Sequence, residues 1–227
     1  MKFKDYKYIR PDLKEIEVEF KKATEIVKNS SDINEVSKTI DSINKIRNTY
    51  NTMATLCSIR NSVDTNDSYY EEEQSFFDQN SPVYASFASE LSKALVNSEI
   101  RSELEKKYGK QWFNLLEADI KVFAPEIIED LQEENRLKTE YRKLSASAKI
   151  EFDGKINNLS QMGPYNVSLD RNVRKAAEAK VVEFYKTNEV KYDEIYDKLV
   201  KVRTSMARKL GYKNFVDFGY LRLGRTD

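Results

Sequence analysis

The chain of 227 residues carries 38 basic and 38 acidic side chains, so its formal net charge is zero. This balance disfavours a nucleic-acid or membrane-surface partner, because both usually require a net basic face. No histidine occurs in the sequence, which excludes histidine-dependent serine or cysteine catalysis and a zinc site of the usual ligands within this chain. With one cysteine, an opening unlike a signal peptide and no run of about 18 apolar residues, we expect a soluble, cytoplasmic protein.

Glycine and proline are scarce, with six and four residues, and this predicts long helices joined by short turns. A first helix is predicted to begin at Pro11 and Asp12, and Ser31 is predicted to cap a longer second helix. Ser81 and Pro82 predict the N-cap and first turn of a third helix. The apolar stripes of these three segments are Leu13, Ile16, Phe20, Ala23 and Val27; Ile33, Val36, Ile40, Ile43, Ile46, Tyr50, Met53 and Cys57; and Phe87, Leu91 and Leu95.

Similar stripes predict further helices in the second half of the chain. One surrounds Trp112, the next begins at Pro125, and another begins at Ser168 or Asp170. A last long helix is predicted to end at Gly211, because glycine favours the C-terminal cap. These stripes are the packing faces of an antiparallel helical array, so the predicted fold class is mainly α, with the apolar residues in its core.

The pattern changes in residues 146–160, where apolar and polar residues alternate on either side of Asp153 and Gly154. This alternation predicts a β-hairpin, because glycine readily adopts the positive φ of a two-residue turn. A lone hairpin is only marginally stable in water, so we expect it to pack on helices or to join other strands. After the hairpin we predict a domain boundary, between an N-terminal helical lobe of residues 1–163 and a second helical region of residues 164–227.

Searches for motifs of binding or catalysis find little. The segment 64–68 begins like a calcium loop, but Tyr69 stands where that loop needs glycine and Ser75 where it needs a bidentate glutamate. The acidic run 71–73 is predicted to be a solvated helix face, and Cys57, on an apolar stripe, to be an inert buried thiol. The fourteen tyrosines either line a peptide groove or pack with their hydroxyls reaching water or a carbonyl.

Several segments spread over most of the chain share one resemblance. They are Lys2–Tyr6, Arg10–Leu13, Phe152–Gly154, Asn158–Ser160, Asp170–Ala176, Asp193–Arg203 and Ala207–Tyr220. Together they resemble the oligoendopeptidase F family, relatives of thimet oligopeptidase among the zinc metallopeptidases. The resemblance is most specific from Phe152 to Asp227, and the helices before this stretch are less distinctive.

This resemblance implies a soluble, mostly helical enzyme whose two lobes enclose a deep channel, in which it cuts short peptides. The family holds its zinc on a His-Glu-x-x-His helix with a further glutamate, and none of these residues can be carried over to a chain without histidine. We therefore expect an N-terminal fragment that walls the channel, is inactive alone, and contains no catalytic or metal-binding residue. No substrate-binding residue is assigned. Its expected partners are short peptides and a missing C-terminal half that holds the zinc, with residues 164–227 beginning the catalytic lobe.

Two other classes of function stay open at this point. A complete, non-catalytic helical scaffold or adaptor fits the neutral charge and the long stripes, whereas a lobe cut from an enzyme should expose an apolar patch, for which Leu221 and Leu223 are candidates. A carboxylate-only hydrolase is disfavoured, because Glu133 and Glu134 are neighbours on different faces of a helix. The predicted hairpin is either an internal structural element or an edge that receives an extended peptide.

Overall fold

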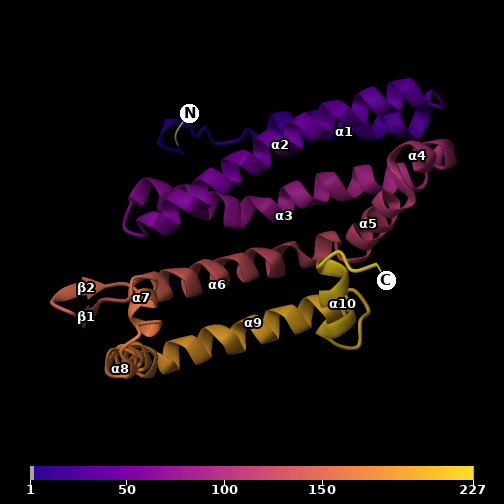
Figure 1. Ribbon diagram of the computed structural model, residues 1–227. Helices are drawn as coiled ribbons and strands as arrows, with labels where there is room; N and C mark the ends of the chain where they lie inside the picture. The colour runs from indigo at the N-terminus through magenta and orange to yellow at the C-terminus, as the bar shows by residue number, and fades with distance from the viewer. Residues whose placement is uncertain (1–2, 227) are drawn as a thin grey trace.

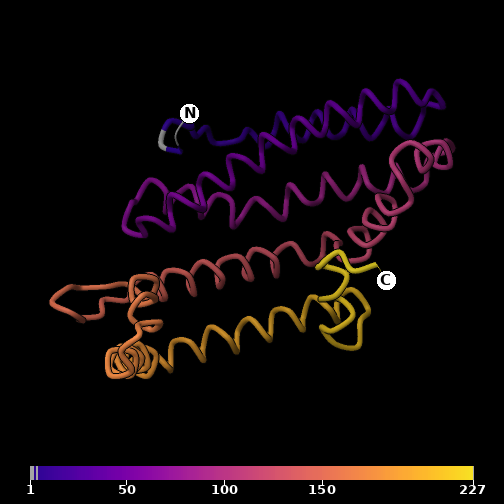
Figure 2. Tube along the Cα trace, in the orientation of Figure 1, coloured from indigo at the N-terminus to yellow at the C-terminus, as the bar shows by residue number. Residues whose placement is uncertain are grey.

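The protein is mainly α-helical, as predicted, in a computed structural model that describes residues 3–226 (Figure 1). Met1, Lys2 and Asp227, where the resemblance begins and ends, lie outside the described residues. The trace in Figure 2 passes back and forth, so an antiparallel helical array is confirmed. Its elements in chain order are η1 (Phe3–Asp5), α1 (Leu13–Asn29), α2 (Ile33–Val63), α3 (Ser68–Val96), α4 (Arg101–Tyr108), α5 (Lys110–Lys121), η2 (Pro125–Ile127), α6 (Ile128–Ala146), β1 (Ile150–Phe152), β2 (Lys155–Asn157), α7 (Gly163–Asn166), α8 (Arg171–Thr187), α9 (Glu189–Lys209) and α10 (Phe215–Arg222).

Side-chain caps fix where several helices begin and end. The Asp12 carboxylate accepts from two backbone N–H groups at the start of α1, where a helix was predicted to begin. Of the two predicted starts of α8, Ser168 and Asp170, the structure has Asp170 as the cap. Gly211, with a φ of 83°, follows the end of α9. The predicted cap of α2 is wrong by one residue, because Asp32 rather than Ser31 accepts from the first turn. A carboxylate at this position also interacts favourably with the helix dipole.

The third predicted helix begins earlier than expected, because α3 starts after its cap at Asp67 and continues through Ser81 and Pro82. A proline inside a helix removes the N–H that would bond the carbonyl four residues earlier, which here belongs to Asp78. The side-chain amide of Asn135 on α6 donates to this carbonyl instead, at 3.1 Å. The prediction of an N-cap at Ser81 is wrong because a neighbouring helix supplies the donor that the proline lacks.

Buried apolar side chains join the helices in successive layers. The largest cluster among the described residues belongs to α1 through α5 and includes Phe20 and Phe113. Smaller clusters join α6 to α9 around Leu137 and join η2, α9 and α10 around Phe218. The core is therefore distributed along the array, which leaves the side chains between α3, α6 and α9 free to form a polar site.

The predicted hairpin forms, with β1 and β2 paired antiparallel. Asp153 and Gly154 make its turn, with φ values of 52° and 67°. Ile150 of β1 is buried in one cluster with Met162 and with Ala177 of α8. The hairpin thus gains stability by packing on helices, which is one of the two expectations from the sequence.

Replacing Gly154 with alanine is expected to destabilise the protein by about 1–2 kcal/mol, because a Cβ strains the backbone in the left-handed region. Gly163→Ala is the matched control, since Gly163 lacks a positive φ and an added Cβ meets no atom within 4 Å at either glycine. Urea unfolding should therefore show the loss for Gly154→Ala alone. Equal stability of the two variants would contradict the turn conformation.

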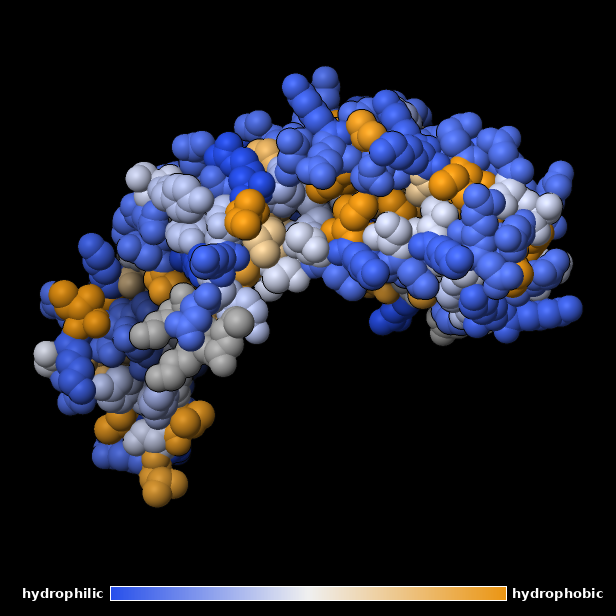
Figure 3. All heavy atoms as spheres, turned by 90° about the horizontal axis from the view of Figure 1, so that it is seen from above, coloured by the Kyte–Doolittle hydropathy of each residue, from blue (hydrophilic) through white to orange (hydrophobic). Residues whose placement is uncertain are grey.

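The molecule as a whole is bowed. Seen from above, it curves around an open concave side, and its surface is mostly hydrophilic with apolar side chains at separate points (Figure 3). Within residues 3–226, no helix combines the length and apolar character needed to cross a membrane.

Candidate functional site

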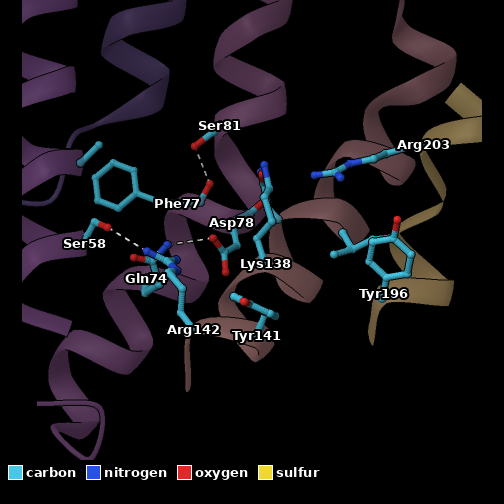
Figure 4. Close-up of a pocket in the computed structure, with 13 residues that line it drawn as sticks. Ser58, Gln74, Phe77, Asp78, Ser81, Lys138, Tyr141, Arg142, Tyr196 and Arg203 are labelled. Atoms are coloured by element: carbon cyan, nitrogen blue, oxygen red, sulfur yellow. Dashed lines mark hydrogen bonds between the residues drawn. The ribbon is translucent and has the colours of Figure 1, made fainter. Parts of the chain in front are cut away.

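A cavity of about 660 Å³ opens between α2, α3, α6 and α9. Its size lies in the range of sites that hold a small ligand. Figure 4 shows that helices far apart in the sequence contribute side chains to it. The lining residues are Ala54, Ser58, Gln74, Phe77, Asp78, Ser81, Asn135, Lys138, Tyr141, Arg142, Tyr196, Leu199 and Arg203.

Asp78 of α3 is held at the cavity by two hydrogen bonds. Gln74 Nε2 donates to its carboxylate at 2.8 Å and Thr139 Oγ1 donates at 2.7 Å. Burial raises the pKa of Asp78, and these two bonds offset part of that increase. Arg142 donates to the hydroxyls of Ser58 and Thr139, each at 2.9 Å. These contacts tie α2, α3 and α6 together and occupy both the carboxylate and the guanidinium.

Glu134 of α6 lies beside the cavity and is only 1% exposed. Arg203 of α9 donates Nε to its Oε1 at 2.7 Å, and Arg222 of α10 donates to its Oε2 at 2.6 Å. Burial by itself raises the pKa of Glu134, but the bonds from Arg222 and Arg203 outweigh it and hold that pKa below its ordinary value. The ionised carboxylate therefore joins α6, α9 and α10.

Lys138 is the third cation near this carboxylate. Its Nζ lies 3.8 Å from Glu134 Oε2, which is an ion-pair distance but too long for a hydrogen bond. Burial lowers the pKa of the Lys138 ammonium, and the charge of Glu134 partly restores it. Figure 4 shows the Arg203 side chain extending across the cavity towards Lys138. One glutamate thus faces three cations, and two of them line the cavity.

The residues singled out in the sequence analysis lie in different settings in the structure. Cys57 is buried, as predicted, and burial raises the pKa of its thiol to about 12. The prediction of a solvated acidic face is right for Glu71 and Glu72 but wrong for Glu73. Glu73 is buried because the segment before α1 folds over α3, where Arg10 donates to its carboxylate at 2.6 Å.

The other acidic residues singled out in the sequence analysis lie at helix ends or in ion pairs. In the calcium-like segment, Asp64 follows the end of α2 and Asp67 caps α3. Glu133 pairs with an arginine on the outer side of α6, whereas Glu134 enters the buried charge cluster, so the two carboxylates are separated as predicted. Within residues 3–226, no group of three or more His, Cys, Asp or Glu residues could hold a metal ion. These described residues do not fit a zinc centre.

The apolar and aromatic candidates divide between core and surface. Tyr84 stacks on Tyr50 in the core, with ring centroids 4.0 Å apart, whereas Tyr196 lines the cavity and is 69% exposed. Leu223 is exposed as expected, and Leu221 is half-buried. Tyrosines therefore occur both in the core and at the cavity.

The cations of the cavity were not predicted. Lys138, Arg142 and Arg203 stand on amphipathic helices, where charged side chains are usually solvated. The sequence feature that could have indicated these cations is a spacing of four residues between Glu134, Lys138 and Arg142. This spacing places the three side chains on one face of a helix. That spacing alone does not reveal that the face points inwards.

Comparison with known proteins identifies the family. A family model described as the peptidase M3 N-terminal domain matches residues 3–123. Over its whole length the chain is similar to solved structures of Pz peptidase A with an inhibitor (47% identity, TM-score 0.94), of an oligoendopeptidase F (46%, 0.95) and of an oligoendopeptidase F from Bacillus anthracis strain Ames (48%, 0.95). It spans 40%, 40% and 42% of the length of those chains. No curated protein sequence matches it. The resemblance is confirmed, and the chain belongs to the peptidase M3 family.

Proposed function

We propose that this chain is the N-terminal part of a zinc-dependent oligoendopeptidase and forms one wall of the channel in which short peptides are cut. The observation that carries the proposal is the match of the entire chain to two oligoendopeptidase F structures at 46% and 48% identity. The bowed shape supports it, because a concave wall suits an enclosed channel (Figure 3). The zinc and its ligands would belong to the portion of the relatives that this chain does not span.

In this proposal the chain binds and positions peptides rather than reacting with them. A rigid wall lowers the entropic cost of holding an extended peptide near a catalytic centre, and a narrow channel excludes folded proteins. The start of a catalytic lobe near residue 164 and a cytoplasmic location, which the single buried cysteine favours, belong to the same proposal.

The test is to express the reading frame beyond Asp227 and to assay an internally quenched short peptide. We expect the longer polypeptide to contain His-Glu-x-x-His, to cleave the peptide and to lose activity with a chelator. The 227-residue chain should not cleave it. A stop codon after Asp227, with a monodisperse product, would overturn the proposal and favour a helical scaffold.

A further inference from the structure

The cavity between α2, α3, α6 and α9 contains more positive than negative charge. Lys138, Arg142 and Arg203 line it, against the single carboxylate of Asp78. Asp78 already accepts from two neutral donors and has no ion pair to a cation within the described residues. Arg142 likewise bonds two hydroxyls. The lining charges therefore do not neutralise one another directly.

The buried Glu134 compensates only part of this excess. Its Oε1 accepts from Arg203 and its Oε2 accepts from Arg222, which lies outside the cavity lining. Arg203 uses Nε for this bond, and in the described part of the chain no hydrogen bond reaches its two terminal nitrogens. Lys138 Nζ makes no hydrogen bond there either, since its nearest carboxylate oxygen is 3.8 Å away. Lys138 and Arg203 therefore each present N–H donors at this cavity that bond no acceptor in the described part of the chain.

The cavity also has walls suited to a peptide. Phe77 and Leu199 supply apolar surface, while Tyr141 and Tyr196 are exposed where the cavity reaches the surface. Exposed tyrosines offer flat apolar faces to a side chain and a hydroxyl to a backbone group. Lys138 and Arg203 are partly covered side chains of the same cavity, whereas Tyr196 is 69% exposed. A peptide that contacts these tyrosines would therefore lie beside the cations.

We propose that this cavity binds a carboxylate of a short peptide and that Lys138 and Arg203 hold it. The inference rests on the proposed peptide-processing function and names a feature that the bound peptide must carry. Spare N–H donors on partly desolvated cations form charge-assisted hydrogen bonds with a carboxylate, and a neutral amide cannot replace that interaction. The carboxylate belongs either to the C-terminus of the peptide or to an aspartate or glutamate side chain.

The test uses the 227-residue chain and three acetylated peptides, with affinities measured by calorimetry or NMR titration. The probes are tetra-alanine with a free C-terminus, its C-terminal amide, and the amide of Ala-Ala-Glu-Ala. We expect the free acid to bind about tenfold more tightly than the tetra-alanine amide. Binding of the glutamate peptide would assign the site to side-chain carboxylates as well, and its failure would assign the site to the C-terminus.

Variants test whether Lys138 is responsible for the tighter binding of the free acid. Lys138→Met should lower the affinity for the free acid about tenfold and leave the affinity for the amide unchanged, and Lys138→Arg should restore it. The control is Lys201→Met, which removes an exposed cation of α9 that pairs with Asp197 outside the cavity. Added salt should weaken binding of the acid alone, a measurement that needs no variant.

Two results would overturn the inference in different ways. If acid and amide bind equally, or if Lys138→Met weakens both alike, the cavity does not select a carboxylate, while peptide binding by this chain stands. If none of the three peptides binds, the carboxylate site and the peptide-binding role of this wall both fail. Cleavage by the longer polypeptide would still be judged by its own assay.

Discussion

Replacing Glu134 with glutamine is expected to lower the free energy of unfolding by about 3 kcal/mol, because it leaves Arg203 and Arg222 without their carboxylate. Because both arginines keep some contact with solvent, the expected loss of stability lies at the lower end of the range for a broken buried ion pair. Glu133→Gln is the matched control, since Glu133 is adjacent and pairs with Arg136 at the surface. Its effect should stay within about 1 kcal/mol in the same urea titration.

The effect of Glu134→Gln should also depend on pH. The folded-state pKa of Glu134 lies below its ordinary value of 4.5, so its carboxylate stabilises the fold above that pH. This stabilisation is lost as the pH falls through the lower folded pKa, where the carboxylate becomes protonated in both states. The difference in stability between the wild type and Glu134→Gln should therefore be constant near neutral pH and shrink below pH 4.5. A difference that does not change over this range would contradict a charged Glu134.

Replacing Phe218 with alanine is expected to destabilise the protein by about 3–5 kcal/mol, the usual cost of removing a buried aromatic ring. Phe218 is 0% exposed and packs in one cluster with Ile127 and Met206. Tyr220→Ala, in the same helix but at a residue that is 49% exposed, should cost about 0.5 kcal/mol. Hydrogen exchange should show faster opening of α10 for Phe218→Ala only. Similar losses for the two variants would contradict the anchoring of α10 through Phe218.

Much of the helical fold could be predicted, because its determinants are local. The apolar stripe of α2 and the caps at Asp12 and Asp170 depend on residues within one or two turns of each other. The hairpin turn at Asp153 and Gly154 is likewise decided by two adjacent residues. Short helices such as α4 and α10 were not predicted, because eight residues give too few turns for a periodic pattern.

The candidate site could not be predicted, because its contacts join distant parts of the chain. Glu134 meets Arg203 and Arg222 across 69 and 88 residues, and no local pattern specifies those pairs. The burial of Glu73 has the same origin, since its partner Arg10 is 63 residues away. Sequence spacing identifies which side chains share a helix face, but tertiary packing decides whether that face is solvated.

The hydrogen bond that compensates for the missing N–H of Pro82 crosses the boundary of the matched family segment. The matched family segment ends at residue 123, whereas the donor to the Asp78 carbonyl comes from Asn135, on the following α6. A polypeptide cut at residue 123 would leave that carbonyl to water, and we expect α3 to be less stable around Pro82. A piece of this chain that keeps this hydrogen bond must therefore include Asn135 of α6. The boundary of a sequence family is in this case a poor place to divide the protein.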